Sequence, residues 1–268
     1  MFTRTRFYLN TPFCYGADKP FRPPTLDSLL GYIWCKEHGY EKTTSEEFAK
    51  NIVFPELPIK KTGKCYHASA MFLPQEPEDK KYVSVAHVIR PRKTMAQETM
   101  ARVSPQQKID EGREQFRACL IPYWEITTPY VDFYADVTGM TEFKCLVNEF
   151  AKLGNLGKKY GIGRGQIREA EVSVVSYDYS IMKDGYATRP LPVTEFPDVK
   201  GPKEYTTYYP PYWFINRKLP NKAMCWMPRQ EQYQPVAADV NFMEELLVSH
   251  PTAKAGGLQF GLTEVVSA

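Results

Sequence analysis

Two stretches with the period of an amphipathic helix constrain the fold of this chain most strongly. In each stretch the apolar residues lie three or four positions apart, so they share one face of a helix. The first face follows Thr25, an expected N-cap, and ends before Gly39, and the second follows Thr141. The two faces consist of Leu26, Leu29, Leu30, Ile33 and Trp34, and of Phe143, Leu146, Val147, Phe150 and Leu153. Both predicted helices therefore pack through one face only.

Segments with the character of β-strands surround both helices. Residues 2–9 alternate between two faces, Thr3, Thr5, Phe7 and Leu9 on one and Phe2, Arg4, Arg6 and Tyr8 on the other. Further strands are predicted at 64–73, 81–90, 128–139 and about 166–177. The order is strand, helix, strand or hairpin, insertion, strand, helix, strand. It is compatible with an α+β, ferredoxin-like βαββαβ unit.

The remaining segments are predicted to extend this unit rather than to form a second one. No linker or internal repeat interrupts residues 1–268, so we expect a single domain. A polar stretch at about 91–127 shows no strong period and is predicted to be an insertion. Residues from about 193 to 268 are predicted to be a C-terminal extension rich in proline and aromatic residues.

The composition excludes several classes of function. No apolar run reaches 18 residues, which predicts that no helix spans a membrane. The first ten residues lack the apolar core of a signal peptide. The 6 cysteines are scattered without a CxxC pair, and the 4 histidines show no metal-binding spacing. These features predict a cytoplasmic protein with free thiols, without a metal or another cofactor.

The segment that points most directly to function is a glycine-rich loop, residues 152–168, at the end of the second helix. The nine positions 157–165 hold four glycines, Gly157, Gly161, Gly163 and Gly165. The cations of the loop, with no acid between them, are Lys152, Lys158, Lys159, Arg164 and Arg168. Glycine allows positive φ and the close approach of another backbone. Successive main-chain N–H groups can bind anions. Repeated phosphates therefore suit this loop better than a single nucleotide does.

Two common nucleotide-binding loops do not match this segment. A Walker A loop needs Ser or Thr after its Gly-Lys pair, whereas Lys159 follows here. A dinucleotide fingerprint opens a helix after a strand, whereas this loop ends a helix and opens a strand.

Two interpretations of the glycine-rich loop stay open: a helix-capping turn with solvated cations, or an RNA phosphate site. The predicted RNA contacts are Lys158, Lys159, Arg164 and Arg168, with Gly161, Gly163 and Gly165 permitting the approach.

Several motifs, in this order, resemble the CRISPR-associated RAMP superfamily. They are LDSLLGY in the first helix, YHASAMF in the next strand, GKKYGIGRGQI after the second helix, and TRPLP further on. The resemblance covers roughly residues 2–38, 64–73 and 128–192. It is strongest to the five-group backbone subunits of type IV effector complexes. It implies an RRM-related, ferredoxin-like fold with a thumb-like insertion.

The resemblance also implies a function. Such a subunit holds the 5′ handle of the CRISPR RNA (crRNA) at the glycine-rich loop and the thumb. It contacts neighbouring backbone and large subunits, and it reaches target DNA through the complex. In most of the superfamily this subunit performs no chemistry, so the resemblance implies a non-catalytic protein.

Further RNA contacts are predicted outside the loop. Arg4 and Arg6 share one face of the first strand, which either faces RNA or forms a solvated strand edge. Arg90, Arg92 and Lys93 form a basic cluster where the insertion begins. This cluster either belongs to a thumb that grips RNA or is simply a solvated run of charge.

Two other classes of function remain as alternatives. A metal-independent endoribonuclease could use His67, Tyr66 and Lys64 as its catalytic groups. Strand geometry argues for packing roles, because Lys64 and Tyr66 face away from His67. A protein-interaction module could instead use the six aromatic residues between 205 and 214, which either pack a loop and an interface or stack on bases.

Overall fold

The computed structural model describes residues 1–14, 23–39, 56–74, 82–90, 119–158, 160–210 and 222–233. All of them belong to one compact unit, Met1–Pro235. They form a mixed α and β structure with more strands than helices. None of the helices in this part of the chain is long and apolar enough to cross a membrane.

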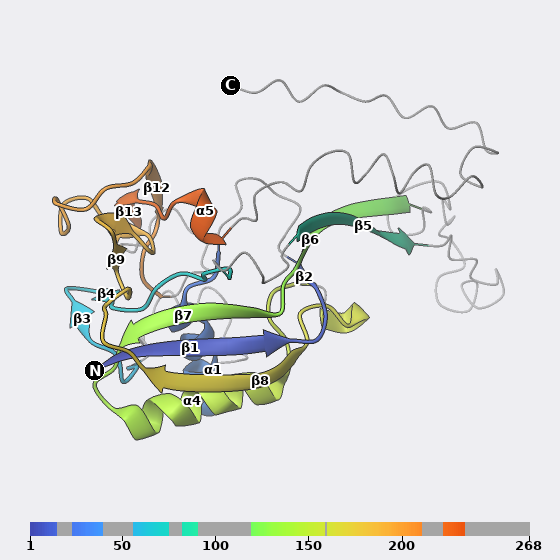
Figure 1. Cartoon of the computed structure of the whole chain (residues 1–268), viewed down its shortest axis with the longest axis horizontal. Helices are drawn as coiled ribbons and strands as arrows, with labels where there is room; N and C mark the ends of the chain where they lie inside the picture. The colour runs from blue at the N-terminus through green and yellow to red at the C-terminus, as the bar shows by residue number, and fades with distance from the viewer. Residues whose placement is uncertain are drawn as a thin grey trace, which may run out of the picture. The chain divides into compact units, whose positions relative to one another are not determined.

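A central antiparallel sheet positions the glycine-rich loop. Its middle strand, β1 (Phe2–Leu9), pairs with β7 (Tyr130–Asp136) on one side and with β8 (Ile167–Val174) on the other. Figure 1 shows β1 between these two neighbours. The glycine-rich loop leads directly into β8, so it lies at the end of the sheet where β1 finishes.

The predicted strand at 64–73 is only partly regular. It contains β4 (Cys65–Tyr66), which pairs with β3 (Lys61–Thr62) in a short hairpin. Its later residues lie along β7 through isolated antiparallel bridges, Ala68 with Ala135 and Phe72 with Asp132. The order in space is therefore β8, β1, β7 and then residues 68–72.

Both predicted helices are present. α1 (Leu26–Glu37) contacts β7, while α4 (Met140–Leu153) contacts α1 and β8. α1 begins after Thr25 as predicted, but the Thr25 hydroxyl makes no capping hydrogen bond. The Thr25 carbonyl instead accepts a 2.6 Å hydrogen bond from the Ser28 hydroxyl. Gly39 follows the helix with φ +76°, as expected of a residue that ends one.

The two helices cover one face of the sheet and form the main core with it. Phe7 of β1 is buried there, and its ring packs edge-on against Phe133 and Phe150, with centroids 5.9 and 5.4 Å away. Arg4 and Arg6 point to the opposite face, which we call the open face. The alternation predicted for residues 2–9 is thus confirmed, because every second side chain is buried.

A second antiparallel pair lies partly within the predicted insertion. β5 (Tyr82–Arg90) pairs along its whole length with β6 (Cys119–Thr127), and β2 (Phe13–Cys14) pairs with the end of β6. The sequence pattern predicts no strand in the insertion, and this is wrong for β6. Proline is uncommon within a paired strand, so Pro122, which lies opposite His87 of β5, obscures this strand in the sequence. Residues 91–118 lie outside the described ranges.

The predicted C-terminal extension contains a smaller sheet with its own core. In this sheet β13 (Lys222–Trp226) lies between β11 (Leu191–Pro192) and β12 (Lys203–Thr207). The remaining elements are β9 (Met182–Lys183), β10 (Tyr186–Ala187) and α5 (Gln230–Tyr233). The buried residues of this second core include Leu191, Tyr208, Tyr209 and Cys225. In the described residues, the proline-rich segments are therefore anchored at Leu191, Tyr208 and Tyr209.

One buried arginine joins the two cores. Nη1 of Arg189 donates to the carbonyl oxygens of Tyr66 and Ala68 at 2.6 and 3.0 Å. Nη2 donates to the carbonyl oxygen of Tyr208 at 2.7 Å and forms an ion pair with Asp27 of α1 at 3.2 Å. Tyr66 and Ala68 belong to the main core and Tyr208 to the second core. A single guanidinium therefore ties both cores together.

Candidate nucleic-acid interface

Two glycines of the glycine-rich loop are required by the protein's own backbone. Gly157 has φ +82°, and a Cβ there would lie 2.5 Å from the carbonyl oxygen of Cys14. Gly165 has φ +70°, and a Cβ there would collide with the carbonyl oxygen of Leu156. The Leu156 N–H donates to the Gly165 carbonyl at 2.7 Å, which fixes this close approach, and the Gly165 N–H donates to the carbonyl of Pro12 at 2.8 Å. The packing of the protein's own backbone therefore accounts for a glycine at position 165, which was predicted to permit RNA contact.

The other two glycines lie at the exposed tip of the loop. A single 3₁₀ turn, η3 (Tyr160–Ile162), contains Gly161, and Gly163 follows it with φ +78°. A Cβ at either glycine would meet nothing within 4 Å. Ile162 between them is 51% exposed. The tip therefore presents open main chain, to which a ligand backbone can come close.

Two acidic residues outside the loop, one distant in the sequence and one nearby, neutralise some of the loop's charge. Arg164 forms an ion pair with Glu125 of β6 at 3.1 Å. Lys152 forms one with Glu149 of α4 at 2.5 Å, and this hydrogen bond raises the pKa of Lys152. The folded loop is therefore less basic than its uninterrupted run of cations in the sequence indicates.

The other predicted cations of the loop differ in setting. The pairing register of β1 and β8 shifts between Tyr8 and Leu9, which leaves Arg168 as the extra residue of a β-bulge. The exposed guanidinium of Arg168 lies over the Tyr8 ring, 5.4 Å from its centroid. Lys158 is also exposed, whereas Lys159 lies outside the described residues. An exposed cation over a half-buried ring suits contact with phosphate.

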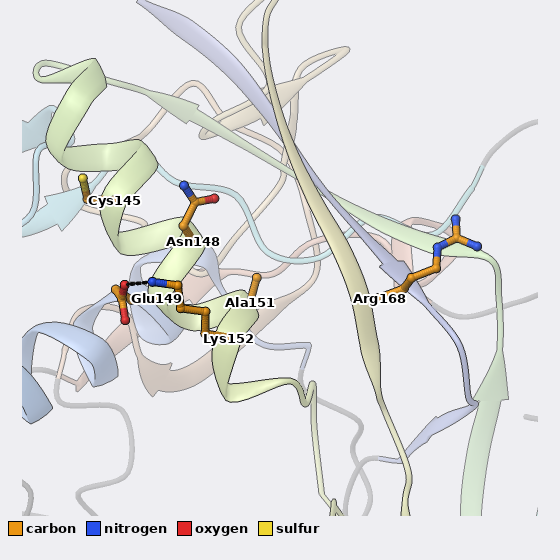
Figure 2. Close-up of a pocket in the computed structure, with 6 residues that line it drawn as sticks. All are labelled: Cys145, Asn148, Glu149, Ala151, Lys152 and Arg168. Carbon is orange, nitrogen blue, oxygen red and sulfur yellow. Dashed lines mark hydrogen bonds and ion pairs between the residues drawn. The ribbon is translucent and has the colours of Figure 1, made fainter.

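A shallow hollow of about 550 Å³ lies along α4, but it does not gather the predicted site residues. The residues that line it are Cys145, Asn148, Glu149, Ala151, Lys152 and Arg168. Figure 2 shows the Arg168 side chain pointing away from the other five. The hollow is therefore a feature of the α4 surface rather than a site built around Arg168.

On the open face, Arg6 is engaged within the protein. Its Nε and Nη2 donate to the two carboxylate oxygens of Asp132, each at 2.8 Å, and this bonding raises the pKa of Arg6. The guanidinium also lies 3.5 Å from the ring centroid of Tyr130. Arg4 makes a looser ion pair with Glu171, at 3.6 Å. Because β1 is the middle strand of the sheet, the strand-edge interpretation of both arginines is wrong.

The three candidate ribonuclease residues take part in three separate sets of contacts. Lys64 Nζ donates to the Tyr209 hydroxyl at 3.4 Å, the Tyr66 hydroxyl accepts from the Leu57 N–H at 3.2 Å, and His67 Nε2 shares a 2.7 Å hydrogen bond with the Thr62 hydroxyl. Tyr66 and His67 are buried, and burial lowers the pKa of His67. This geometry favours packing roles. In the described ranges, no group of His, Cys, Asp and Glu could hold a metal ion.

The predictions for the insertion and for the aromatic segment have different outcomes. Arg90 is the last residue of β5, while Arg92 and Lys93 lie outside the described residues, so the thumb stays a prediction. Tyr208 and Tyr209 are buried in the second core, with ring centroids 4.8 Å apart. Packing is thus confirmed for these two aromatic residues.

Sequence reasoning missed the buried pair of Arg189 and Asp27. Arg189 stands in the short TRPLP motif, and its partners in the main core lie 121 to 162 residues away. The one available signal was an acid within the otherwise apolar LDSLL of α1, where a buried carboxylate requires a partner.

Comparison with known proteins finds a remote structural similarity. No protein-family model matches the chain, and no curated protein matches it. A chain in the cryo-EM structure of the Type III-B Cmr-beta bound to cognate target RNA aligns with a TM-score of 0.37 and 11% sequence identity. The alignment covers 64% of this chain and 60% of that one, so this chain spans less than two thirds of its length. A similarity of this size assigns neither a family nor a function.

Proposed function

We propose that this protein is a non-catalytic RNA-binding subunit of a CRISPR ribonucleoprotein effector complex. The observation that carries the proposal is the tip at Gly161 and Gly163, where exposed main chain lies in a loop that also holds the exposed Lys158. Main-chain N–H groups and cations together suit a row of phosphates. The motifs that resemble the RAMP superfamily support the same assignment.

The topology supports a finer proposal for the fold. The order β8, β1, β7 and residues 68–72, with both helices on one face, agrees with a ferredoxin-like, RRM-related βαββαβ core. On this basis the chain is a single RAMP domain. The insertion serves as its thumb, and the sheet of β11, β13 and β12 belongs to its C-terminal extension.

Within the complex, the proposed role is that of a type IV five-group backbone subunit in the cytoplasm. It holds the 5′ handle of the crRNA, contacts the neighbouring backbone and large subunits, and reaches target DNA through them. Tyr205 and Met224 support protein contact, because they are cross-strand neighbours and are 62% and 48% exposed. An exposed aromatic and apolar pair of this kind is common at subunit interfaces.

The test reverses the charge of two exposed side chains of the loop by replacing them with glutamate. The double variant Lys158→Glu/Arg168→Glu is compared with Lys144→Glu, an exposed lysine on α4, by recovery of co-purifying RNA and by binding of single-stranded RNA at several salt concentrations. We expect the double variant to lose the RNA, and Lys144→Glu to keep it. The slope of log K against log salt should become shallower by roughly 1.4, at about 0.7 for each lost phosphate contact. Unchanged RNA recovery in a folded double variant would contradict RNA binding at this loop.

A further inference from the structure

An aromatic cluster lies on the open face, at the opposite end of the sheet from the glycine-rich loop. After β8 ends, the chain places Tyr177 and Tyr179 against Tyr134 of β7, with ring centroids 5.8 and 5.3 Å from the Tyr134 ring. The rings of Tyr177 and Tyr179 are 4.5 Å apart and inclined by 37°. Tyr177 is 39% exposed. The cluster therefore offers an aromatic surface to solvent rather than a closed core.

Cations flank these rings. Lys183 of β9 lies over the Tyr179 ring, 5.0 Å from its centroid. Arg4 lies directly across from Tyr134 in the pairing of β1 with β7. The nearby acid Asp178 is engaged in its own turn, where its carboxylate accepts hydrogen bonds from the N–H and hydroxyl of Ser180 at 2.9 and 2.6 Å.

Two donors beside the cluster lack hydrogen-bond partners. The Nε of Arg4 and the hydroxyl of Ser173, which are opposite each other in the pairing of β1 with β8, are buried and find no acceptor among the described residues. Glu171 approaches Arg4 only at 3.6 Å, and its other oxygen accepts from the Tyr8 hydroxyl at 3.1 Å. Buried polar groups are normally paired, so these two donors indicate a missing acceptor.

We propose that Tyr177 and Tyr179 form a base-stacking site for single-stranded RNA, with Arg4 and Lys183 on the adjacent phosphates. This proposal rests on the proposed function and adds a second contact to it. An exposed tyrosine ring flanked by cations matches the bases and phosphates of single-stranded nucleic acid, whereas the core of a protein interface is depleted of charged residues. At about 3.3 Å per residue, the five steps from Arg4, which is paired with Tyr134, to Leu9 separate this site from the loop end of β1 by roughly 16 Å. One RNA strand therefore runs along the open face from the loop to the tyrosines.

The test distinguishes the two sites by RNA length, because only the long RNA can contact the loop and the tyrosines together. Wild type, Tyr177→Ala, Tyr177→Phe and the control Tyr32→Ala are titrated with single-stranded RNA of about 3 and about 15 nucleotides. Tyr32 is 43% exposed on α1, outside the open face. We expect Tyr177→Ala to weaken binding of the long RNA at least about fivefold and to leave the short RNA unchanged. Tyr177→Phe and Tyr32→Ala should bind as wild type does.

Each other outcome has a definite meaning. If wild type binds neither RNA, the proposed function and this inference both fail. If wild type binds the long RNA and Tyr177→Ala binds it equally well, only this inference is overturned. Should Tyr177→Ala fail to fold, photo-cross-linking of wild type to RNA containing 5-iodouridine decides: linkage to Tyr177 or Tyr179 supports the site, and linkage only elsewhere overturns it. Loss of a protein partner from Tyr177→Ala with RNA binding intact would also overturn it.

Discussion

The Arg189 guanidinium and the Asp27 carboxylate lie 3.2 Å apart in the interior, and both side chains are fully buried. Removing two charges from water costs free energy, which is offset only when geometry is good and further hydrogen bonds are made. Arginine meets this condition here because its planar group also donates to three main-chain carbonyls. The pair therefore fixes α1 and both cores in one arrangement.

Replacing Arg189 with methionine should reduce the free energy of unfolding by about 3–5 kcal/mol, because the Asp27 carboxylate stays buried without its partner. Chemical denaturation measures the change. The double variant Asp27→Leu/Arg189→Met should recover part of the loss, since no uncompensated charge remains. A single variant within about 1 kcal/mol of wild type would show that the pair does not hold the cores together.

The two kinds of glycine in the loop should respond differently to alanine. Gly165→Ala should lower stability by about 1–2 kcal/mol or more, because its positive φ is strained for alanine and its Cβ meets the Leu156 carbonyl. Gly161→Ala should leave stability within about 0.5 kcal/mol, yet weaken RNA binding by narrowing the approach to the tip. Thermal melting and RNA titration measure both effects. Equal melting temperatures for the two variants would contradict this division.

Alanine variants of Arg6 and Arg168 should affect different properties, stability for Arg6 and RNA binding for Arg168. Arg6→Ala leaves the largely buried carboxylate of Asp132 without its two hydrogen bonds, so unfolding should become easier by about 2–3 kcal/mol. RNA affinity should change little. Arg168→Ala should do the reverse, with stability within about 0.5 kcal/mol of wild type and RNA affinity reduced. Denaturation and RNA titration of both variants test this contrast, and a stable Arg6→Ala variant that has lost RNA binding would contradict it.

Stability should fall as the pH is lowered through the range where His67 titrates. Burial and the charge of Lys60 lower the pKa of His67, and the opposing charges of Asp178 and Asp136 have smaller effects than burial. The unfolded chain, whose histidine titrates near about pH 6.5, therefore takes up the proton first as the pH falls. The contribution of His67 is complete above that pH and is lost progressively toward its folded pKa.

Melting temperatures between about pH 7.5 and about pH 5 measure this dependence. His67→Gln, which cannot titrate, should flatten the profile over this range. If the profiles of wild type and His67→Gln have the same slope, another group is responsible.

Local patterns in the sequence predicted the local structure well. The alternation of residues 2–9 corresponds to β1, and the two apolar faces correspond to α1 and α4. These patterns are reliable because the burial of one face repeats with the period of the element. The same alternation placed Arg4 and Arg6 together on the open face.

Partners that are distant in the sequence could not be predicted in this way. The glycine-rich loop forms an unbroken basic run in the sequence, yet Glu125 of β6 folds against Arg164 and neutralises part of it. Arg6 likewise shows no sign in the sequence of its bond to Asp132. Lateral pairing and ion pairing depend on which strands become neighbours, and the order of residues along one strand does not contain this information.

The separation of Asp27 and Arg189 by 162 residues also has a consequence in time. At about 5–20 residues per second, a ribosome needs roughly 8–32 s to add Arg189 after Asp27. β8 is likewise synthesised late, so one edge of β1 has no partner strand until β8 has been made. The N-terminal half therefore leaves the ribosome before the residues that complete its core exist, and a chaperone that binds nascent chains would meet α1 with its carboxylate still unpaired.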